Sequence, residues 1–172
     1  ETVWPEALDE TNSGKELYRN YLILITMVIS IMVLLINLIN YNFWQATGLT
    51  IINLIAMLIG NWFAYLITRE YLCRKLSFDT NLALNLTVYS GVIFIIFHSI
   101  GNALGNIFLG QLFTLLSFIF IRTLYKGLGQ IPRLHPGQKT NILVISSLAI
   151  ICIPVIINQL LMIIFGISAF NI

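Results

Sequence analysis

Five long apolar runs, separated by short polar stretches, make up most of the chain. They cover residues 21–39, 49–67, 82–100, 107–121 and 142–165. A helix needs about 20 mostly apolar residues to cross roughly 30 Å of hydrocarbon, and each run approaches or reaches that length. The pattern therefore predicts an all-α fold, in which residues 21–172 form a polytopic membrane bundle of five transmembrane helices.

Short polar segments mark the ends of the runs. Residues 40–42 end the first run, residues 68–70 end the second, and residues 101–106 interrupt the pattern after the third. The last linker is so short that we expect the third and fourth helices to form an antiparallel hairpin. Gly101 and Gly105 have the small-xxx-small spacing of a helix–helix contact, which a tight hairpin explains better than a dimer interface.

The composition agrees with a membrane protein. Hydrophobic residues make up 58% of the 172 residues and charged residues only 9%, whereas soluble domains carry about 25% charged residues. A soluble domain of this size cannot bury so much apolar surface. Cys73 and Cys152 are far apart, which predicts neither a disulfide framework nor a metal site. Cys73 lies beside two basic residues, where it is either palmitoylated or, as we favour, a spectator thiol.

The distribution of Lys and Arg predicts the orientation. Two basic residues precede the first run, three follow the second and four lie between the fourth and fifth, which accounts for all nine. With five spans, these three segments fall on one face, and positively charged loops face the cytoplasm. We therefore expect a cytoplasmic N-terminus, an outer C-terminus and, for a prokaryotic source, residence in the cytoplasmic membrane. The basic residues are Lys15, Arg19, Arg69, Arg74, Lys75, Arg122, Lys126, Arg133 and Lys139.

The first 20 residues form a cytoplasmic segment that is acidic and polar, the reverse of a signal peptide. Because the chain begins at Glu1 rather than Met, we expect N-terminal truncation or processing. Pro5 suits a first helical turn, and Trp4 and Leu8 would share one helix face. Since Trp prefers the headgroup region, we predict a short interfacial helix on the cytoplasmic leaflet or a docking peptide; the alternative is a frayed polar leader.

Uncharged polar residues are the candidates for chemistry inside the membrane. No Asp, Glu, Lys or Arg lies well inside any run, so the paired carboxylates of an intramembrane protease and the buried acid of a proton pump are missing. Polar groups at membrane depth are often functional, but asparagines more often join helices through hydrogen bonds of about 0.6–2 kcal/mol. We favour that role. The candidates are Asn53, Asn61, Asn85, His98, Asn158 and Gln159.

His98 is the one titratable group near the centre or end of a run. It is either a proton or ligand contact near the outer face or, as we favour, a boundary residue hydrogen-bonded to a neighbouring helix or water. Ser90 and Ser99 flank it, but no acid or second base completes a nucleophilic group. The sequence therefore predicts no catalytic residues, no cofactor and no metal site.

Two further segments carry alternatives. Residues 125–139 are rich in Gly and Pro, which predicts an irregular loop. Its Tyr125, Lys126, Arg133 and Lys139, together with Trp4, are candidate contacts for anionic lipid headgroups or an acidic partner, at about 1 kcal/mol per cation; ordinary topology determinants explain the charges equally well. Pro154 in the fifth run is either a hinge or, as we favour, a static kink stabilised by neighbouring helices.

Several short stretches are similar to those of a known family: residues 4–6, 17–22, 85–90, 124–128 and 131–132 with Lys139. On these stretches the chain resembles the Yip family of small membrane proteins (the Yip-one domain), specifically its prokaryotic branch. The resemblance implies five spans, a cytoplasmic N-terminus and a short outer C-terminal tail. Eukaryotic members act in vesicle traffic and interact with Rab GTPases, but their acidic Asp-Leu-Tyr-Gly-Pro stretch is absent here, and Val92 and Ile93 stand where a proline is common. Rab binding is therefore not expected.

Three hypotheses for function follow. The first is a non-catalytic scaffold or membrane-organising protein of the Yip type, which acts through membrane lipids, other membrane proteins or self-association and has no nucleic-acid partner. The second is a small transporter or channel component for a neutral or lipid substrate. An enzyme is the weakest hypothesis, because the sequence holds no catalytic constellation.

Overall fold

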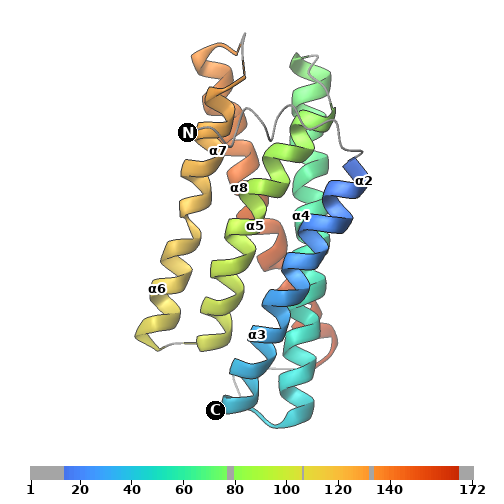
Figure 1. Cartoon of the computed structure of the whole chain (residues 1–172), viewed down its shortest axis with the longest axis vertical. Helices are drawn as coiled ribbons and strands as arrows, with labels where there is room; N and C mark the ends of the chain where they lie inside the picture. The colour runs from blue at the N-terminus through green and yellow to red at the C-terminus, as the bar shows by residue number, and fades with distance from the viewer. Residues whose placement is uncertain (1–13, 77–79, 106, 132–133, 167–172) are drawn as a thin grey trace.

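The computed structural model describes residues 14–76, 80–105, 107–131 and 134–166, and every regular element in these ranges is helical. Trp4 and Leu8, for which an interfacial helix is predicted, lie outside the described residues. The elements, in chain order, are α2 (Gly14–Leu17), the π-helical η1 (Tyr18–Ile23), α3 (Leu24–Asn40), α4 (Phe43–Leu76), α5 (Thr80–Leu104), α6 (Phe108–Ser117), α7 (Ile119–Gly129) and α8 (Pro136–Ile164) (Figure 1).

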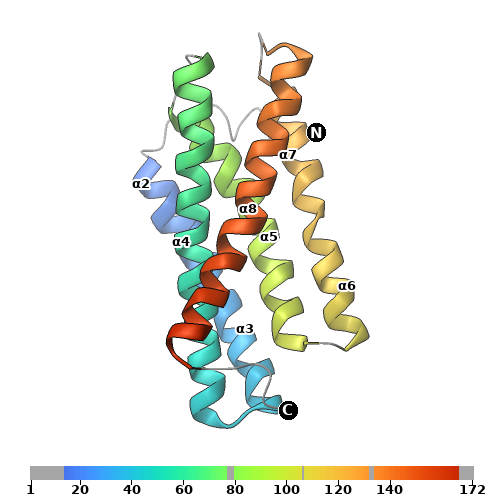
Figure 2. The ribbon, with the colours of Figure 1, turned by 180° about the vertical axis from the view of Figure 1, so that it is seen from behind.

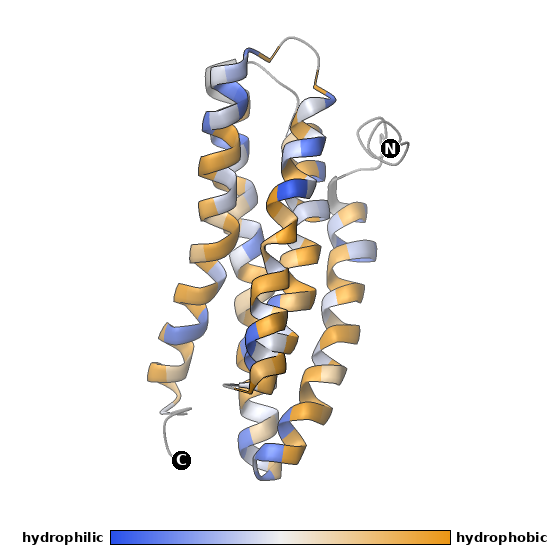
Figure 3. Ribbon diagram, turned by 90° about the vertical axis from the view of Figure 1, so that its left-hand side faces the viewer, coloured by the Kyte–Doolittle hydropathy of each residue, from blue (hydrophilic) through white to orange (hydrophobic). Residues whose placement is uncertain are grey.

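Five helical stretches in the described residues are long and apolar enough to cross a membrane: Tyr18–Asn40, Phe43–Leu72, Thr80–Leu104, Phe108–Gly129 and Pro136–Ile164. Large apolar side chains cover the outside of the bundle, and apolar colour follows the helices along most of their length (Figure 3). A bilayer solvates such a surface, whereas water does not. The prediction of an all-α bundle with five spans is confirmed, and the chain is a multi-pass integral membrane protein.

Helix α5 forms the centre of the bundle. In the apolar stretch of α5 that is able to cross a membrane, 67% of the residues are buried, against 22% in the span formed by α6 and α7. Helices α3 and α4 lie along one side of α5 and α6 and α7 along the other, and α8 packs behind (Figures 1 and 2). The Phe94 ring of α5 meets the Phe120 ring of α7 edge to face, with centroids 5.6 Å apart, so aromatic packing holds the fourth span to the core.

Two tight turns join neighbouring helices at one end of the bundle. Between α3 and α4, Asn42 caps the new helix because its Oδ1 accepts a hydrogen bond from the Gln45 backbone N–H at 2.9 Å. Between α5 and α6, Gly105 has φ +66°, a left-handed conformation that glycine adopts without steric cost. A Cβ atom at Gly101 would lie 2.6 Å from Thr114 Oγ1. The two helices therefore pack closely, and the predicted hairpin is confirmed.

The prediction that residues 125–139 form an irregular loop is wrong at both ends. Helix α7 continues to Gly129, eight residues beyond the predicted end of the fourth span at Ile121, and α8 begins at Pro136. Hydropathy marks the limit of the hydrocarbon rather than the end of a helix. Leu124 and Leu128 are buried one turn apart while Tyr125 is exposed, so an amphipathic helix extends past the apolar run. Pro136 occupies the first helical turn of α8, where proline is favoured.

The described basic side chains lie near one end of the bundle. Arg19 belongs to η1, Arg69 to the C-terminal part of α4, Arg122 and Lys126 to α7, and Lys139 to the first turns of α8. These helix ends lie together, opposite the end with the two tight turns (Figures 1 and 2). The helix arrangement therefore agrees with the charge asymmetry seen in the sequence.

Candidate functional site

The interior of the bundle contains many polar side chains, and those that are buried among the described residues are all uncharged. They come from five helices, so helix packing rather than local sequence brings them together. Several bond within their own helix, as when the Ser30 hydroxyl donates to the Thr26 carbonyl at 2.8 Å. The set is Thr26, Ser30 and Asn37 of α3; Thr50, Asn53, Asn61 and Thr68 of α4; Asn85, Thr87, Ser90 and Ser99 of α5; Ser117 of α6; and Ser146 and Asn158 of α8.

Helices α4 and α8 are in close antiparallel contact at two levels. A Cβ atom at Gly60 would lie 2.5 Å from Pro154 Cγ and 2.6 Å from Pro154 Cα. Further along α4, towards its C-terminus, the Thr68 hydroxyl donates a hydrogen bond to Ser146 Oγ at 3.0 Å. The two contacts are eight residues apart on each helix, which fixes their register. Pro154 is buried in this contact, so its surroundings favour a static, packed proline over a hinge.

Helices α4 and α5 meet next to the contact between Gly60 and Pro154. The buried Asn61 side chain packs onto Gly91, and a Cβ atom at Gly91 would overlap the Asn61 amide nitrogen. The Asn61 carbonyl oxygen and the hydroxyl of Ser90, the residue next to Gly91, have no hydrogen-bond partner among the described residues. Buried polar atoms are usually paired. Asn61 therefore fills a space that a glycine leaves open, without full satisfaction of its own polar groups.

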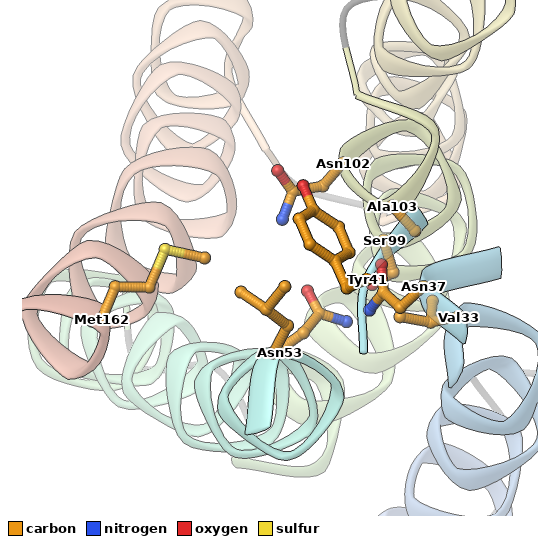
Figure 4. Close-up of a pocket in the computed structure, with 9 residues that line it drawn as sticks. Val33, Asn37, Tyr41, Asn53, Ser99, Asn102, Ala103 and Met162 are labelled. Atoms are coloured by element: carbon orange, nitrogen blue, oxygen red, sulfur yellow. The ribbon is translucent and has the colours of Figure 1, made fainter. Parts of the chain in front are cut away.

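A small polar cavity lies between α3, α4, α5 and α8, at the end of the bundle with the two tight turns. It encloses about 40 Å³, which at roughly 10–15 Å³ each is room for about three water molecules. Its apolar wall is formed by Val33, Leu49, Ala103 and Met162. Figure 4 shows Tyr41, Asn53 and Asn102 converging on one space, with Met162 across from them. The polar side chains that line it are Asn37, Tyr41, Asn53, Ser99 and Asn102.

Two of these polar side chains are buried and unpartnered. Asn53 is 4% exposed and Ser99 is 1% exposed, and neither Asn53 Oδ1 nor Ser99 Oγ has a hydrogen-bond partner among the described residues. Asn37 is held in place because its amide nitrogen donates to Thr50 Oγ1 at 3.2 Å. A buried polar atom without a partner costs about 1–3 kcal/mol. A small molecule or group that hydrogen-bonds to both atoms would remove that cost.

An open groove of about 450 Å³ runs along the turn between α5 and α6. The described residues that line it are also uncharged, with polar groups from Asn102, Gln111 and Thr114. Asn102 lines both the groove and the small cavity. The end of the bundle opposite the basic residues thus has two neighbouring hollows, both suited to hydrogen bonding with an uncharged group.

The structure separates the four intramembrane residues that the sequence singles out. Asn53 lines the cavity, Asn61 lies in the α4–α5 contact, and Asn85 is buried nearer the other end of α5. His98 lines neither hollow; its ring stacks on Phe94, with centroids 4.7 Å apart and planes 13° from parallel. Reasoning from the sequence missed Asn37, Tyr41, Ser99 and Asn102 as cavity residues. In the sequence, Tyr41 and Asn102 stand out only as polar residues at the ends of apolar runs, and Asn37 and Ser99 lie within such runs.

The candidate contacts for lipids or partners lie at the basic end. Tyr125 is 61% exposed on α7, Lys126 beside it is exposed, and Lys139 on α8 is half-buried. Helices α7 and α8 pack together, so these side chains belong to one region of the surface. Trp4 and Arg133 lie outside the described residues.

The chemistry available at both ends is hydrogen bonding and charge attraction. Among the described residues, His, Cys, Asp and Glu side chains form no group of three or more that could hold a metal ion. The cavity offers amide and hydroxyl groups, which both donate and accept hydrogen bonds. The basic end offers the Lys126 cation next to the exposed Tyr125 in α7.

Comparison with family models, with curated proteins and with solved structures finds no match to this chain. The resemblance to the Yip family therefore stays a prediction from the sequence.

Proposed function

We propose that this protein is a non-catalytic scaffold that organises other membrane components. The observation that carries the proposal is the packing around Gly60 and Asn61, where α4 touches both α8 and α5 without room for a methyl group. A passage between these three helices would have to break that contact. A bundle closed at this level suits a protein that presents surfaces to partners better than one that conducts a solute.

The surface near the end of α7 is the part that we propose meets partners. Tyr125 and Lys126 are exposed there, and Lys139 lies on the adjoining helix. A cation near an anionic headgroup or an acidic segment contributes about 1 kcal/mol. An exposed aromatic ring beside it adds contact area at the membrane–water boundary. This combination favours an acidic membrane-protein segment as the partner, with anionic lipid as a further contact.

We infer that the basic end faces the cytoplasm, with the N-terminus inside and the C-terminus outside. The inference rests on the grouping of basic helix ends at one end of the bundle and on the positive-inside rule. In a chain with Cys73 and Cys152 replaced by Ser, Gln130→Cys should react with a membrane-impermeant maleimide only in inverted vesicles. Asn40→Cys, at the opposite end, should react only in right-side-out vesicles. The reverse pattern would show that the orientation is wrong.

The scaffold role predicts a protein partner in stoichiometric amount. The full chain, captured from gently solubilised membranes, should retain another membrane protein or a second copy of itself, as measured by mass spectrometry of proteins and lipids. Lys126→Ala should lower the recovery of that partner about fivefold, the effect of about 1 kcal/mol. Arg69→Ala removes the same charge from an exposed site on α4 and serves as the control. A specifically retained lipid or small molecule without any protein partner would count against the scaffold.

The second candidate is a small transporter or channel component for a neutral substrate. The polar cavity and the unpartnered Asn53, Asn61 and Ser99 atoms favour it. In this case Asn61→Leu should abolish flux of the substrate at unchanged abundance of the protein, measured as a transport phenotype in cells. If the protein is a scaffold, the same variant should fold and retain its partner.

A further inference from the structure

The cavity between α3, α4, α5 and α8 has the properties of a ligand site rather than of a packing defect. Cavities left by imperfect apolar packing are dry and lack polar atoms. Here two nearly fully buried polar atoms, Asn53 Oδ1 and Ser99 Oγ, lack partners and belong to side chains that line the space. Asn53 Oδ1 needs a donor, and the Ser99 hydroxyl needs a donor, an acceptor or both. A hydroxyl group both donates and accepts hydrogen bonds, so it can pair with Asn53 Oδ1 and with the Ser99 hydroxyl.

The walls limit the ligand to an uncharged group. Among the described residues, those that line the cavity and the adjoining groove carry no charge. An ion brought to this depth would lose its hydration without gaining a counter-charge, which costs several kcal/mol. Amide and hydroxyl walls replace the hydrogen bonds that a neutral polar group makes in water. The chemistry therefore selects alcohols over phosphates, ammonium groups or carboxylates.

The size and position of the cavity indicate how such a group would enter. About 40 Å³ accommodates two or three non-hydrogen atoms, such as a terminal hydroxymethyl group, whereas the groove that shares Asn102 provides about 450 Å³ for a larger remainder. Tyr41 is half-buried and Asn102 is exposed, so polar groups reach from the cavity towards the surface. Trp44, 82% exposed near the start of α4, lies at the same end, where an exposed Trp is typical of headgroup depth.

We propose that this cavity binds the terminal hydroxyl groups of an uncharged polyol, with Asn53 and Ser99 inside and Asn102 at the shared edge with the groove. The polyol is either the headgroup of a neutral lipid in the leaflet at this end of the bundle or a water-soluble molecule. This site does not depend on the scaffold role, because it lies at the opposite end from the surface of Tyr125 and Lys126.

The chain offers a matched pair of variants for the test. Asn53→Leu removes an unpartnered carboxamide from the cavity. Asn158→Leu removes one that is equally unpartnered, at 6% exposed, but does not line the cavity. Both variants delete a buried orphan atom, so both should keep or slightly gain stability without ligand. Ser99→Ala provides a smaller change at the second cavity residue, in case Asn53→Leu fails to fold.

The probes are monoglucosyl diacylglycerol in phosphatidylcholine nanodiscs and, in a separate arm, free glycerol and glucose. Binding to the full chain is measured by native mass spectrometry for the lipid and by thermal stabilisation for the soluble molecules. We expect Asn53→Leu and Ser99→Ala each to weaken binding about three- to tenfold, the loss of about one neutral hydrogen bond, and Asn158→Leu to leave it unchanged.

Binding of the glycolipid alone identifies a headgroup as the source of the polyol, and binding of the free molecules alone identifies a soluble ligand. Either result, with the expected pattern of variants, supports the site. If no probe binds, or if Asn158→Leu weakens binding as much as Asn53→Leu does, the cavity holds only water and the proposal is overturned. Preference for phosphatidylglycerol with the same variants unaffected would overturn it as well, since the site would then recognise charge.

Discussion

Gly60→Ala is expected to destabilise the protein strongly, because it forces α4 and α8 apart. The added Cβ atom would lie 2.5–2.7 Å from three atoms of Pro154, including its Cα. A backbone atom in a buried helix cannot turn aside, so α4 and α8 must separate. Overpacking costs about 1–3 kcal/mol, and here the separation would also stretch the 3.0 Å hydrogen bond from Thr68 to Ser146. We expect a loss of about 3 kcal/mol in the free energy of unfolding.

The measurement is equilibrium unfolding of the purified protein in mixed micelles with increasing SDS, followed by circular dichroism. Gly129→Ala is the control, because Gly129 is also helical and a Cβ atom there would meet nothing within 4 Å. Alanine is a better helix former than glycine by about 1 kcal/mol, so the control should be neutral or slightly stabilising. Equal stability of the two variants would mean that α4 and α8 do not cross at Gly60 and Pro154.

Gly91→Ala is expected to destabilise the protein by about 1–3 kcal/mol, and removal of the Asn61 side chain is expected to restore most of that loss. A Cβ atom at Gly91 would occupy the position of the Asn61 amide nitrogen. Asn61 is 2% exposed, so its amide has little space into which it could move. In the double variant Gly91→Ala with Asn61→Ala, the methyl group takes part of the volume that the amide vacates.

A double-mutant cycle measures this coupling by the same SDS titration. Residues in contact show interaction energies of about 0.5–3 kcal/mol, and here the sign should favour the double variant over the sum of the two single variants. Gly91→Ala with Asn158→Ala gives a control cycle, which should be additive. Additivity in the Asn61 cycle would exclude the contact, and with it the packing on which the scaffold proposal rests.

The surroundings of Asn61 and Asn53 distinguish two intramembrane asparagines of the same helix. Asn61 packs against a helix that approaches too closely for any larger residue than glycine at position 91, so its role is to fit helices together. Asn53 lines a cavity and has an unpartnered oxygen, and these surroundings are the basis of the binding role that we propose for it. The sequence presents the two residues alike, as single asparagines in one apolar run, and favours a structural role for both.

Helix ends show where hydropathy fails as a guide. The apolar run predicts that the fourth helix stops at Ile121, yet α7 continues to Gly129 because Leu124 and Leu128 are buried. The glycines and prolines of residues 125–139 suggest a loop, but Gly127 is buried within α7 and Pro136 starts α8. Glycine is tolerated in a helix where close packing repays its entropy, and proline is favoured in a first turn. Only the neighbouring helices reveal which case applies.

The sequence by itself determined that the protein crosses the membrane five times, because the transfer of an apolar run into hydrocarbon depends on local composition and length. It also determined that the basic residues gather at one end, since charge parity follows from the number of spans. The tertiary structure decided which side chains meet. Helices α4 and α8 are apolar on nearly every face, so no periodic pattern shows which face turns inward. The meeting of Gly60 with Pro154, and of Asn53 with Ser99 around one cavity, depends on the register and rotation of helices remote in the chain, which packing alone sets.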